Sequence, residues 1–183
     1  MAFTDDELIF ALKSGHLPAF ETLYHRHRDA MLRVASRILN HRADAEDAVQ
    51  NAFLDLFRHA RRFKGRSSFA TWLYRIVVNA ALKCKQRRPA EEALKNADLV
   101  IGAHPTGEEG ETAEILDQEI DALPMQQKLT FTLSEVEGFT LKEVGQILDI
   151  EEGTARYHLF KARERLRERL GPYLDSGSHK ETR

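Results

Sequence analysis

The chain has 183 residues and a formal net charge of −2 at pH 7, with 42% hydrophobic and 31% charged residues. This balance is ordinary for a water-soluble protein of one or two modest domains, and no apolar run approaches the ~20 residues that a membrane span needs. The N-terminus carries acids where a secretory signal would carry basic residues, and the single cysteine, Cys84, excludes an internal disulfide. We therefore expect a cytoplasmic protein.

Helix signals fill the first half of the chain, whereas strand signals are nearly absent. A capping box at Thr4–Glu7 opens a first helix that Gly15 can close, and Pro18 suits the first turn of the next helix. Apolar residues then recur every three to four positions in three segments: 20–38, 49–60 and 69–80. We predict one compact helical domain over residues 1–88.

Residues 89–111 combine prolines and glycines with acids and show no sustained period, which predicts a flexible acidic linker. Four more helical segments follow: about 112–122, 125–137, 141–148 and 154–170. They predict a second domain over residues 112–170, followed by a disordered tail over residues 171–183. The expected fold class is all-α, with two small helical domains joined by the linker.

The small net charge is the sum of three blocks whose charge alternates in sign along the chain. Residues 56–90 hold ten Lys and Arg and no acid, and residues 91–121 hold ten acids and one lysine. Arginine dominates again in residues 156–169. Such segregation indicates charged partners. A solvated helix face is an equally good interpretation of either basic block taken alone.

The segment "GFTLKEVGQILDIEEGTARYHLFKARERL", residues 138–166, joins a short helix to a basic one. A capping box at Thr140–Glu143 opens the first helix, and residues 149–153 make a turn. The second helix is expected to bury Ala155, Leu159, Ala162 and Leu166. This is the pattern of a helix-turn-helix, whose second helix enters the major groove of DNA. A helical hairpin with a charged solvent face is the alternative.

Three longer stretches resemble one protein family. The run "ALPMQQKLTFTLSEVEGFTLKEVGQILDIEEGTARYHLFKARERLRERL" resembles region four of bacterial sigma factors. The runs "DAEDAVQNAFLDLF" and "FKGRSSFATWLYRIVVNAALKCKQRR" resemble region two of the extracytoplasmic-function (group four) sigma subfamily. The resemblance covers nearly the whole chain in the order of the family, with a linker where that family has one.

The resemblance implies a dissociable subunit of RNA polymerase that reads −35 and −10 promoter elements, performs no covalent chemistry and needs no cofactor. Its partners would be core RNA polymerase, promoter DNA and an anti-sigma factor, without direct membrane contact. The clamp helices of the largest polymerase subunit would bind the acidic-apolar helix, at Asp44, Asp47, Gln50 and Phe53.

By the same resemblance, the −10 element would be read by the loop 63–69 and the helix after it, where a non-template base is flipped out of the duplex. The matching residues and their basic neighbours are Lys64, Arg66, Ser67, Ser68, Arg75, Asn79, Lys85, Arg87 and Arg88. The −35 element would be faced by Thr154, Arg156, Tyr157, Phe160, Lys161 and Arg163. Tyr157 and Lys83 depart from the usual residues of the family, so no promoter sequence is inferred.

Two other functional classes explain less of the sequence than a sigma factor does. A standalone helix-turn-helix regulator, which never contacts core polymerase, would explain the C-terminal half but leave the acidic-apolar helix and the loop 64–68 without a role. An enzyme is disfavoured because His25 and His27 would point about 200° apart on a helix and the sequence has neither an HExxH motif nor a cysteine cluster. The linker either threads the nucleic-acid channels of the polymerase or is a plain tether.

Overall fold

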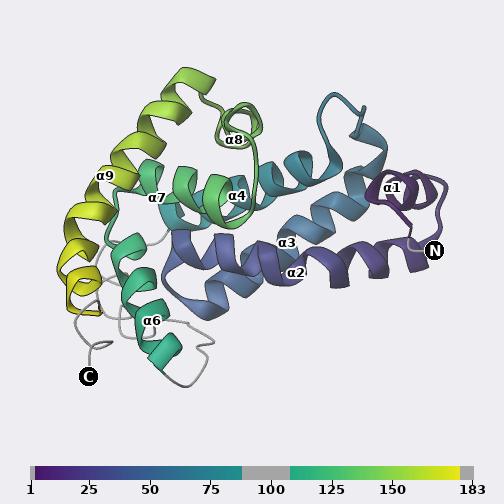
Figure 1. The fold of residues 1–183 in the computed structure, drawn as a ribbon. Helices are drawn as coiled ribbons and strands as arrows, with labels where there is room; N and C mark the ends of the chain where they lie inside the picture. Colours follow the sequence, from purple (N-terminus) through teal and green to yellow (C-terminus); the bar gives the residue numbers. More distant parts are fainter. Residues whose placement is uncertain (1–2, 88–107, 178–183) are drawn as a thin grey trace.

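The computed structural model describes residues 3–87 and 108–177, and every element in these two ranges is helical (Figure 1). The all-α fold predicted from the sequence is therefore confirmed. The predicted flexibility of the linker falls largely on residues 88–107, outside the described ranges. Among the helices of the described ranges, none is long and apolar enough to cross a membrane.

The first domain is built from α1 (Asp5–Lys13), α2 (Leu17–Leu39), α3 (Arg42–His59), the 3-10 turn η1 (Ala60–Arg62) and α4 (Phe69–Arg87). The predicted capping box opens α1, because the hydroxyl of Thr4 accepts from the Glu7 N–H while the Glu7 carboxylate accepts from the Thr4 N–H. Helices α2, α3 and α4 pack on one another and fully bury Leu23, Phe53 and Leu73.

The second domain is built from α6 (Glu108–Asp121), α7 (Met125–Phe131), the π-helical turn η2 (Thr132–Val136), α8 (Leu141–Leu148) and α9 (Glu152–Gly177). The turn between α8 and α9 packs tightly on α8. A Cβ added to Gly145 would lie 2.7 Å from the carbonyl oxygen of Ile150, so the absence of a side chain permits this close approach. Asp149 in this turn has a left-handed φ of 58°.

Two element boundaries differ from the prediction. Helix α6 begins at Glu108, inside the predicted linker 89–111, because the acids at its start suit the positive end of the helix dipole. Helix α9 continues to Gly177, so residues 171–177 are helical where a disordered tail was predicted. Pro172 removes one backbone donor there, but its fixed φ is compatible with a helix.

The predicted helix over residues 125–137 divides into two parts. After α7 the backbone widens into η2, and the Glu137 N–H donates to the carbonyl oxygen of Thr132 at 3.0 Å. Gly138 follows with a φ of +77°, a conformation that favours glycine. The chain reverses at this point, and Glu137 and Phe139 contact the first domain.

The two domains pack directly on each other. Helix α8 lies against α4, and α7 lies against α2 (Figure 1). Leu133 and Val144 of the second domain belong to the same buried cluster as Leu73 and Val77 of the first. One hydrophobic core therefore extends through both domains.

Replacing Thr140 with alanine is expected to lower the free energy of unfolding by about 1 kcal/mol. The Thr140 hydroxyl accepts a hydrogen bond from the Glu143 N–H at 3.3 Å, and alanine leaves this donor at the start of α8 without a protein partner. Urea unfolding followed by circular dichroism measures the change. The control is Lys142→Ala at the neighbouring exposed position, and equal effects of the two substitutions would contradict the assigned cap.

Candidate nucleic-acid interface

The outer surface of α9 presents large side chains to solvent. Tyr157 and Phe160 are 58% and 61% exposed, and Arg156 and Thr154 are exposed beside them. The opposite side of the helix is buried through Ala155, Leu159, Ala162 and Leu166, as predicted. Packing of that side fixes α9 in place and leaves the outer side chains free to enter a groove of DNA.

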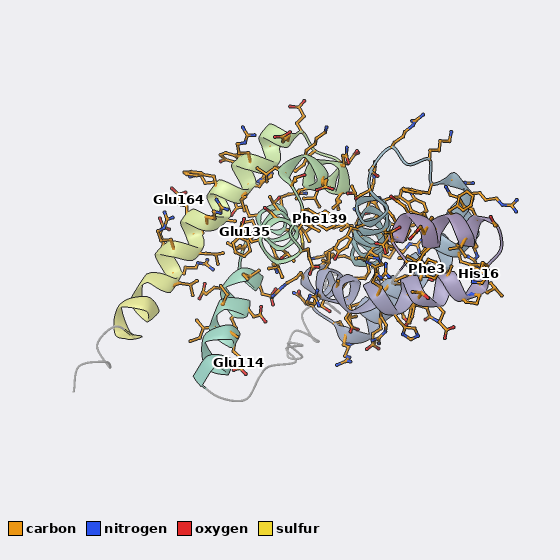
Figure 2. The ribbon with its side chains drawn as sticks, turned by 45° about the vertical axis from the view of Figure 1, so that its right-hand side comes forward. Phe3, His16, Glu114, Glu135, Phe139 and Glu164 are labelled. Carbon is orange, nitrogen blue, oxygen red and sulfur yellow. The ribbon has the colours of Figure 1, made fainter. Side chains whose placement is uncertain are left out.

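The three basic side chains predicted to face the −35 element all have acidic neighbours. The Arg156 guanidinium lies 2.9 Å from Glu152, one turn earlier, and Lys161 Nζ lies 2.6 Å from Glu164. The hydrogen bond to Glu164 raises the pKa of Lys161. Arg163 instead contacts Glu135 of η2 at 2.7 Å, so it also ties α9 to η2. Figure 2 shows Glu164 on the outer side of α9 and Glu135 on its inner side.

The loop before α4 is anchored at its base and open at its tip. Lys13 Nζ donates to the Phe63 carbonyl at 2.7 Å, and the Phe63 ring packs against Trp72 and Phe69 with centroids 5.2 and 6.0 Å apart. Lys64 and Arg66 at the tip are exposed. Lys64 and Arg66 are thus exposed at the tip of a loop whose base is packed among aromatic rings.

The two serines of this loop have different surroundings. Ser68 caps α4, because its hydroxyl accepts from the Thr71 N–H at 3.1 Å and lies 2.7 Å from the Thr71 hydroxyl. Ser67 is half-buried and donates to the Ser68 carbonyl at 3.2 Å. Ser68 is therefore already engaged in the structure, although its side chain lies at the surface.

The remaining residues predicted for the −10 element are spread along α4. Arg75 and Asn79 are exposed in its middle, whereas Lys85 and Arg87 are exposed near its C-terminal end. The 19 residues of α4 span about 28 Å at a rise of 1.5 Å per residue, so the loop tip and the C-terminal pair are far apart. Arg88 lies outside the described residues. The predicted set is thus one extended surface and not a compact cluster.

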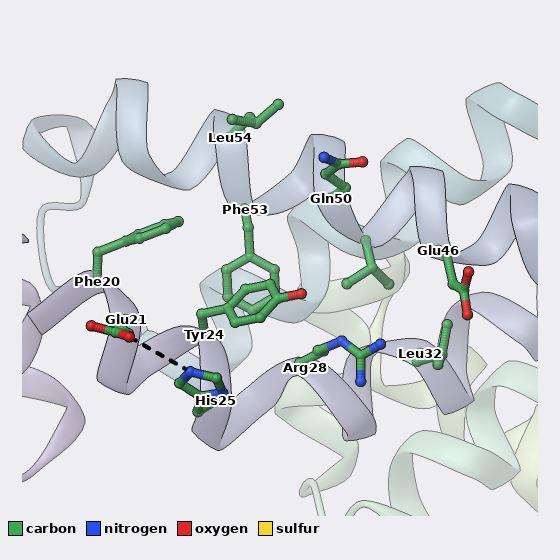
Figure 3. A pocket seen from close by; sticks show the side chains of 11 residues that line it. Phe20, Glu21, Tyr24, His25, Arg28, Leu32, Glu46, Gln50, Phe53 and Leu54 are labelled. Atoms are coloured by element: carbon green, nitrogen blue, oxygen red, sulfur yellow. Dashed lines mark ion pairs between the residues drawn. The ribbon is translucent and has the colours of Figure 1, made fainter. Parts of the chain in front are cut away.

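A groove of about 650 Å³ runs along the surface between the packed helices α2 and α3, and we call it the α2–α3 groove. Its lining comprises Phe20, Glu21, Tyr24, His25, Arg28, Leu32, Glu46, Val49, Gln50, Phe53 and Leu54 (Figure 3). Gln50 is exposed and Leu54 is 41% exposed, so both can meet a partner directly. The mixture of apolar and charged side chains suits another protein surface.

Phe53 is less accessible than the other residues predicted to contact polymerase. It was predicted as a contact for polymerase, but its side chain is only 2% exposed and packs edge-on against Tyr24 at 4.9 Å and Phe20 at 6.3 Å. Figure 3 shows it pointing from α3 toward Tyr24 of α2. Phe53 forms the floor of the α2–α3 groove, because it lies on the apolar stripe of α3 that faces the core.

The predicted acids Asp44 and Asp47 do not line this groove, and the apolar residues Leu54 and Phe57 were not predicted as contacts. Asp47 is exposed and Asp44 is partly buried, with a carboxylate oxygen 3.6 Å from His41 Nδ1. Leu54 lines the groove, and Phe57 follows it by one turn of α3. Phe57 is 44% exposed and packs against Phe20 at 5.3 Å. An apolar stripe too wide for one buried face was the signal that could have found them.

A helix-turn-helix whose second helix has a solvent-exposed outer side, and another basic helix preceded by an open loop, define a two-domain helix-turn-helix DNA-binding protein. Residues 23–88 match the family model of Sigma-70 region 2, and residues 113–166 match that of Sigma-70, region 4. The first match begins within α2 and covers most of the first domain, and the second lies within the second domain.

Curated relatives extend over nearly the whole chain. The ECF RNA polymerase sigma-E factor of Haemophilus influenzae is 31% identical, covering 93% of this chain and 97% of its own. The ECF RNA polymerase sigma factor SigM of Mycobacterium tuberculosis is 32% identical, covering 95% of this chain and 88% of its own. The chain belongs to the extracytoplasmic-function (ECF) family of RNA polymerase sigma factors.

Two solved structures share the fold. The sigma factor RpoE of Bartonella quintana, solved in complex with the anti-sigma factor NepR, has a TM-score of 0.68 over 83% of this chain and 96% of its own. CnrH, solved in complex with the cytosolic domain of CnrY, has a TM-score of 0.67 over 94% of this chain and 97% of its own. Both are 21% identical to this chain, so they establish the arrangement of helices alone.

Proposed function

We propose that this protein acts as an alternative sigma factor that binds core RNA polymerase and directs initiation at promoters carrying −35 and −10 elements. The observation that carries the proposal is the outer surface of α9, where Tyr157 and Phe160 are 58% and 61% exposed on a helix that is firmly packed behind them. Large aromatic side chains exposed beside Arg156 suit contacts with base edges and thymine methyl groups in the major groove.

For the −10 element we propose the exposed loop before α4. Lys64 and Arg66 can hold phosphates, and the polar groups of Ser67 and Ser68 suit the edge of a flipped base. Along α4, Arg75, Asn79, Lys85 and Arg87 extend this surface for the displaced single strand. Unpairing a base costs only a few kcal/mol, which such contacts can offset.

For core RNA polymerase we propose the α2–α3 groove together with the exposed Asp47 of α3. Gln50 and Leu54 offer exposed contacts, and Asp47 adds negative charge for steering toward a basic partner surface. The clamp helices of the largest polymerase subunit are the proposed occupant. Because RNA polymerase and DNA are the partners, the proposed place of action is the cytoplasm, and no covalent step or cofactor is involved.

An anti-sigma factor completes the proposed set of partners. The Bartonella quintana protein of the same fold was solved with an anti-sigma factor bound, which supports looking for one here. Affinity purification of the tagged full chain from its native cells, followed by mass spectrometry, tests this. Recovery of core polymerase subunits without any stoichiometric inhibitor would contradict this part of the proposal.

The decisive experiment is run-off transcription with purified core RNA polymerase, this protein and a library of genomic fragments. New start sites that share two spaced upstream elements are expected, and their alignment would give the promoter sequence. A standalone regulator would bind DNA without associating with core enzyme or producing start sites. That alternative is not favoured, because the match to region two accounts for the N-terminal half that it would leave without a role.

Replacing Leu54 with glutamate is expected to weaken binding to core polymerase by about 1–2 kcal/mol, because it places a charge in the apolar part of the groove. The matched control is Leu116→Glu on α6, where the leucine is 39% exposed against 41% for Leu54. Biolayer interferometry with immobilised core enzyme measures both affinities. If the two variants bind equally well, the groove is not the polymerase site.

A further inference from the structure

Helix α1 lies outside both ranges that the family models match. The match to Sigma-70 region 2 begins at residue 23, whereas α1 ends at Lys13. The helix nevertheless packs against α2, η1 and α4, beside the loop proposed to read the −10 element (Figure 1). Three of its side chains, Leu8, Ile9 and Leu12, are buried in the core of the first domain. Helix α1 is therefore a fixed neighbour of that loop.

Lys13, the last residue of α1, contacts Phe63 in two ways. Its ammonium group donates a hydrogen bond to the Phe63 carbonyl oxygen at 2.7 Å and lies 5.1 Å from the centroid of the Phe63 ring. Phe63 ends η1, and the last carbonyl groups of a helix have no partner within that helix. A charged donor makes the hydrogen bond stronger, and the ring adds a cation–π attraction. Lys13 therefore fixes the point at which the chain leaves η1 and enters the loop.

The partner of Lys13 is a carbonyl group and not an acid. Within residues 3–87 and 108–177, Lys128 and Lys161 lie next to Asp121 and Glu164, whereas Lys13 forms no ion pair. Its place in the last turn of α1 suits the dipole of that helix, but the dipole requires no particular partner. A half-buried ammonium group without a carboxylate depends on its carbonyl partner to replace lost water. The contact with Phe63 is therefore specific.

The loop that follows Phe63 is short and is held at both ends. Phe63 and Phe69 are both buried, and their rings pack edge-on with centroids 6.0 Å apart. The five residues between them include the exposed Lys64 and Arg66, and Gly65 turns the chain at the tip with a φ of +68°. In so short a loop, a displacement of the Phe63 backbone also displaces the tip.

The opposite end of α1 is fixed on α2 by Asp5. The Asp5 carboxylate accepts a hydrogen bond from the Arg26 guanidinium at 2.5 Å, and its other oxygen lies 2.8 Å from His27 Nε2. The His27 ring in turn lies 5.7 Å from the ring of Phe69, at the start of α4. Helix α1 thus connects α2, through Asp5, to the first residue of the loop, through Lys13.

We propose that Lys13 is a positioning residue for the −10-reading loop: it holds the backbone at Phe63 and so keeps Ser67 and the loop tip where they receive a flipped base. The inference rests on the proposed −10 function of this loop and adds a residue that acts through it. Polar groups held in the bound conformation cost less to order when the base arrives, so a fixed loop binds the base more tightly than a mobile one. Lys13 contributes through Phe63 and not by contacting DNA.

Four substitutions in the full chain separate the position of the loop from the charge of the protein. Lys13→Met keeps the length of the side chain but removes the donor and the charge, whereas Lys13→Arg keeps both. Asp5→Asn loosens the other end of α1 and makes the protein more positive, which by itself would favour DNA binding. Lys142→Met, at an exposed position of α8, is the control for the loss of one positive charge.

Binding is measured on the complex with core RNA polymerase. Fluorescence anisotropy follows a single-stranded −10 oligonucleotide taken from a promoter mapped by run-off transcription. Abasic substitutions along this strand locate the base whose loss weakens binding of the unchanged complex most. A −35 duplex in the same assay, and urea unfolding of the free variants, report whether the rest of the protein is intact.

Lys13→Met is expected to bind the intact strand about fivefold to tenfold more weakly but the abasic strand about as well as the unchanged protein, so its preference for the base is largely lost. Lys13→Arg should keep this preference within about twofold. Asp5→Asn should lower it about twofold to threefold in spite of the added positive charge. Lys142→Met should keep the full preference, and all four variants should bind the −35 duplex equally well.

An undiminished preference for the base in Lys13→Met would overturn the inference. Equal losses on the intact and abasic strands, with a salt slope smaller by about one, would also overturn it, because Lys13 would then contact a phosphate. A parallel loss of −35 binding and of resistance to urea would reduce Lys13 to a general stabilising role. Should Lys13→Met fail to fold, Asp5→Asn decides, and an unchanged or increased preference there contradicts the inference.

Two further outcomes bear on the proposed function itself. If no abasic position weakens binding of the unchanged complex, the loop reads no flipped base and the inference fails, while −35 binding and run-off transcription still support the sigma function. If the unchanged complex neither binds the −35 duplex nor starts transcription, the proposed function and this inference fail together.

Discussion

Replacing Phe53 with alanine is expected to lower the free energy of unfolding by about 3–5 kcal/mol, which is a large part of the stability of a domain this size. The Phe53 side chain is 2% exposed and packs against the rings of Phe20 and Tyr24. Alanine leaves a cavity between α2 and α3, which cannot close without moving one helix. Urea unfolding monitored by the fluorescence of Trp72 and by circular dichroism measures the change.

Leu54→Ala is the matched control for this substitution, since Leu54 is the next residue on α3 and is 41% exposed. It is expected to leave the free energy of unfolding within about 0.5–1 kcal/mol of the unchanged protein. Comparing these two substitutions thus distinguishes the buried floor of the α2–α3 groove from its exposed rim. A loss of less than about 1 kcal/mol for Phe53→Ala would show that the buried position assigned to this ring is wrong.

Replacing Arg156 with alanine is expected to weaken binding to the −35 duplex by about 1–3 kcal/mol and to leave affinity for core polymerase unchanged. The pair of Arg156 with Glu152 does not prevent this role, because both side chains are well exposed, at 70% and 49%, and such surface ion pairs contribute little. The guanidinium can therefore exchange Glu152 for a guanine edge or a phosphate at small cost.

The control for Arg156 is Arg165→Ala, which removes the same charge nine residues later on the opposite flank of α9, where the guanidinium donates to Gln127. Anisotropy titrations at several salt concentrations distinguish the two kinds of contact. Loss of affinity on one promoter sequence alone indicates base contacts, and a uniform loss with a smaller salt slope indicates phosphate contacts. Equal effects of the two variants would mean that Arg156 contributes only charge.

Local patterns were sufficient for most of the fold. The capping boxes at Thr4 and Thr140 form as predicted, because cap and partner are three residues apart and need no distant contact. The buried side of α9 was likewise predicted residue by residue from its spacing. The end of α9 was not, because whether a helix continues through Pro172 depends on neighbours that a single local pattern does not contain.

The candidate sites likewise include some residues that a single helix predicts and others that depend on the packing of two helices. Arg156, Tyr157 and Phe160 are exposed where the helical period places them, because solvent exposure on a single helix follows from its own sequence. The burial of Phe53 beneath the groove was not predicted, because α2 covers one edge of α3 and the sequence of α3 alone does not show which edge. The α2–α3 groove needs both helices and so was not visible in either stretch.

The sequence by itself determined an all-helical protein with a helix-turn-helix, a basic helix behind an open loop, and the order of regions that marks the sigma family. Only the tertiary structure decided that the two domains close on each other through Glu137, Tyr74 and the shared core. Helix periodicity and caps arise from interactions a few residues apart, whereas Tyr74 and Glu137 are 63 positions apart and meet only when the whole chain has packed.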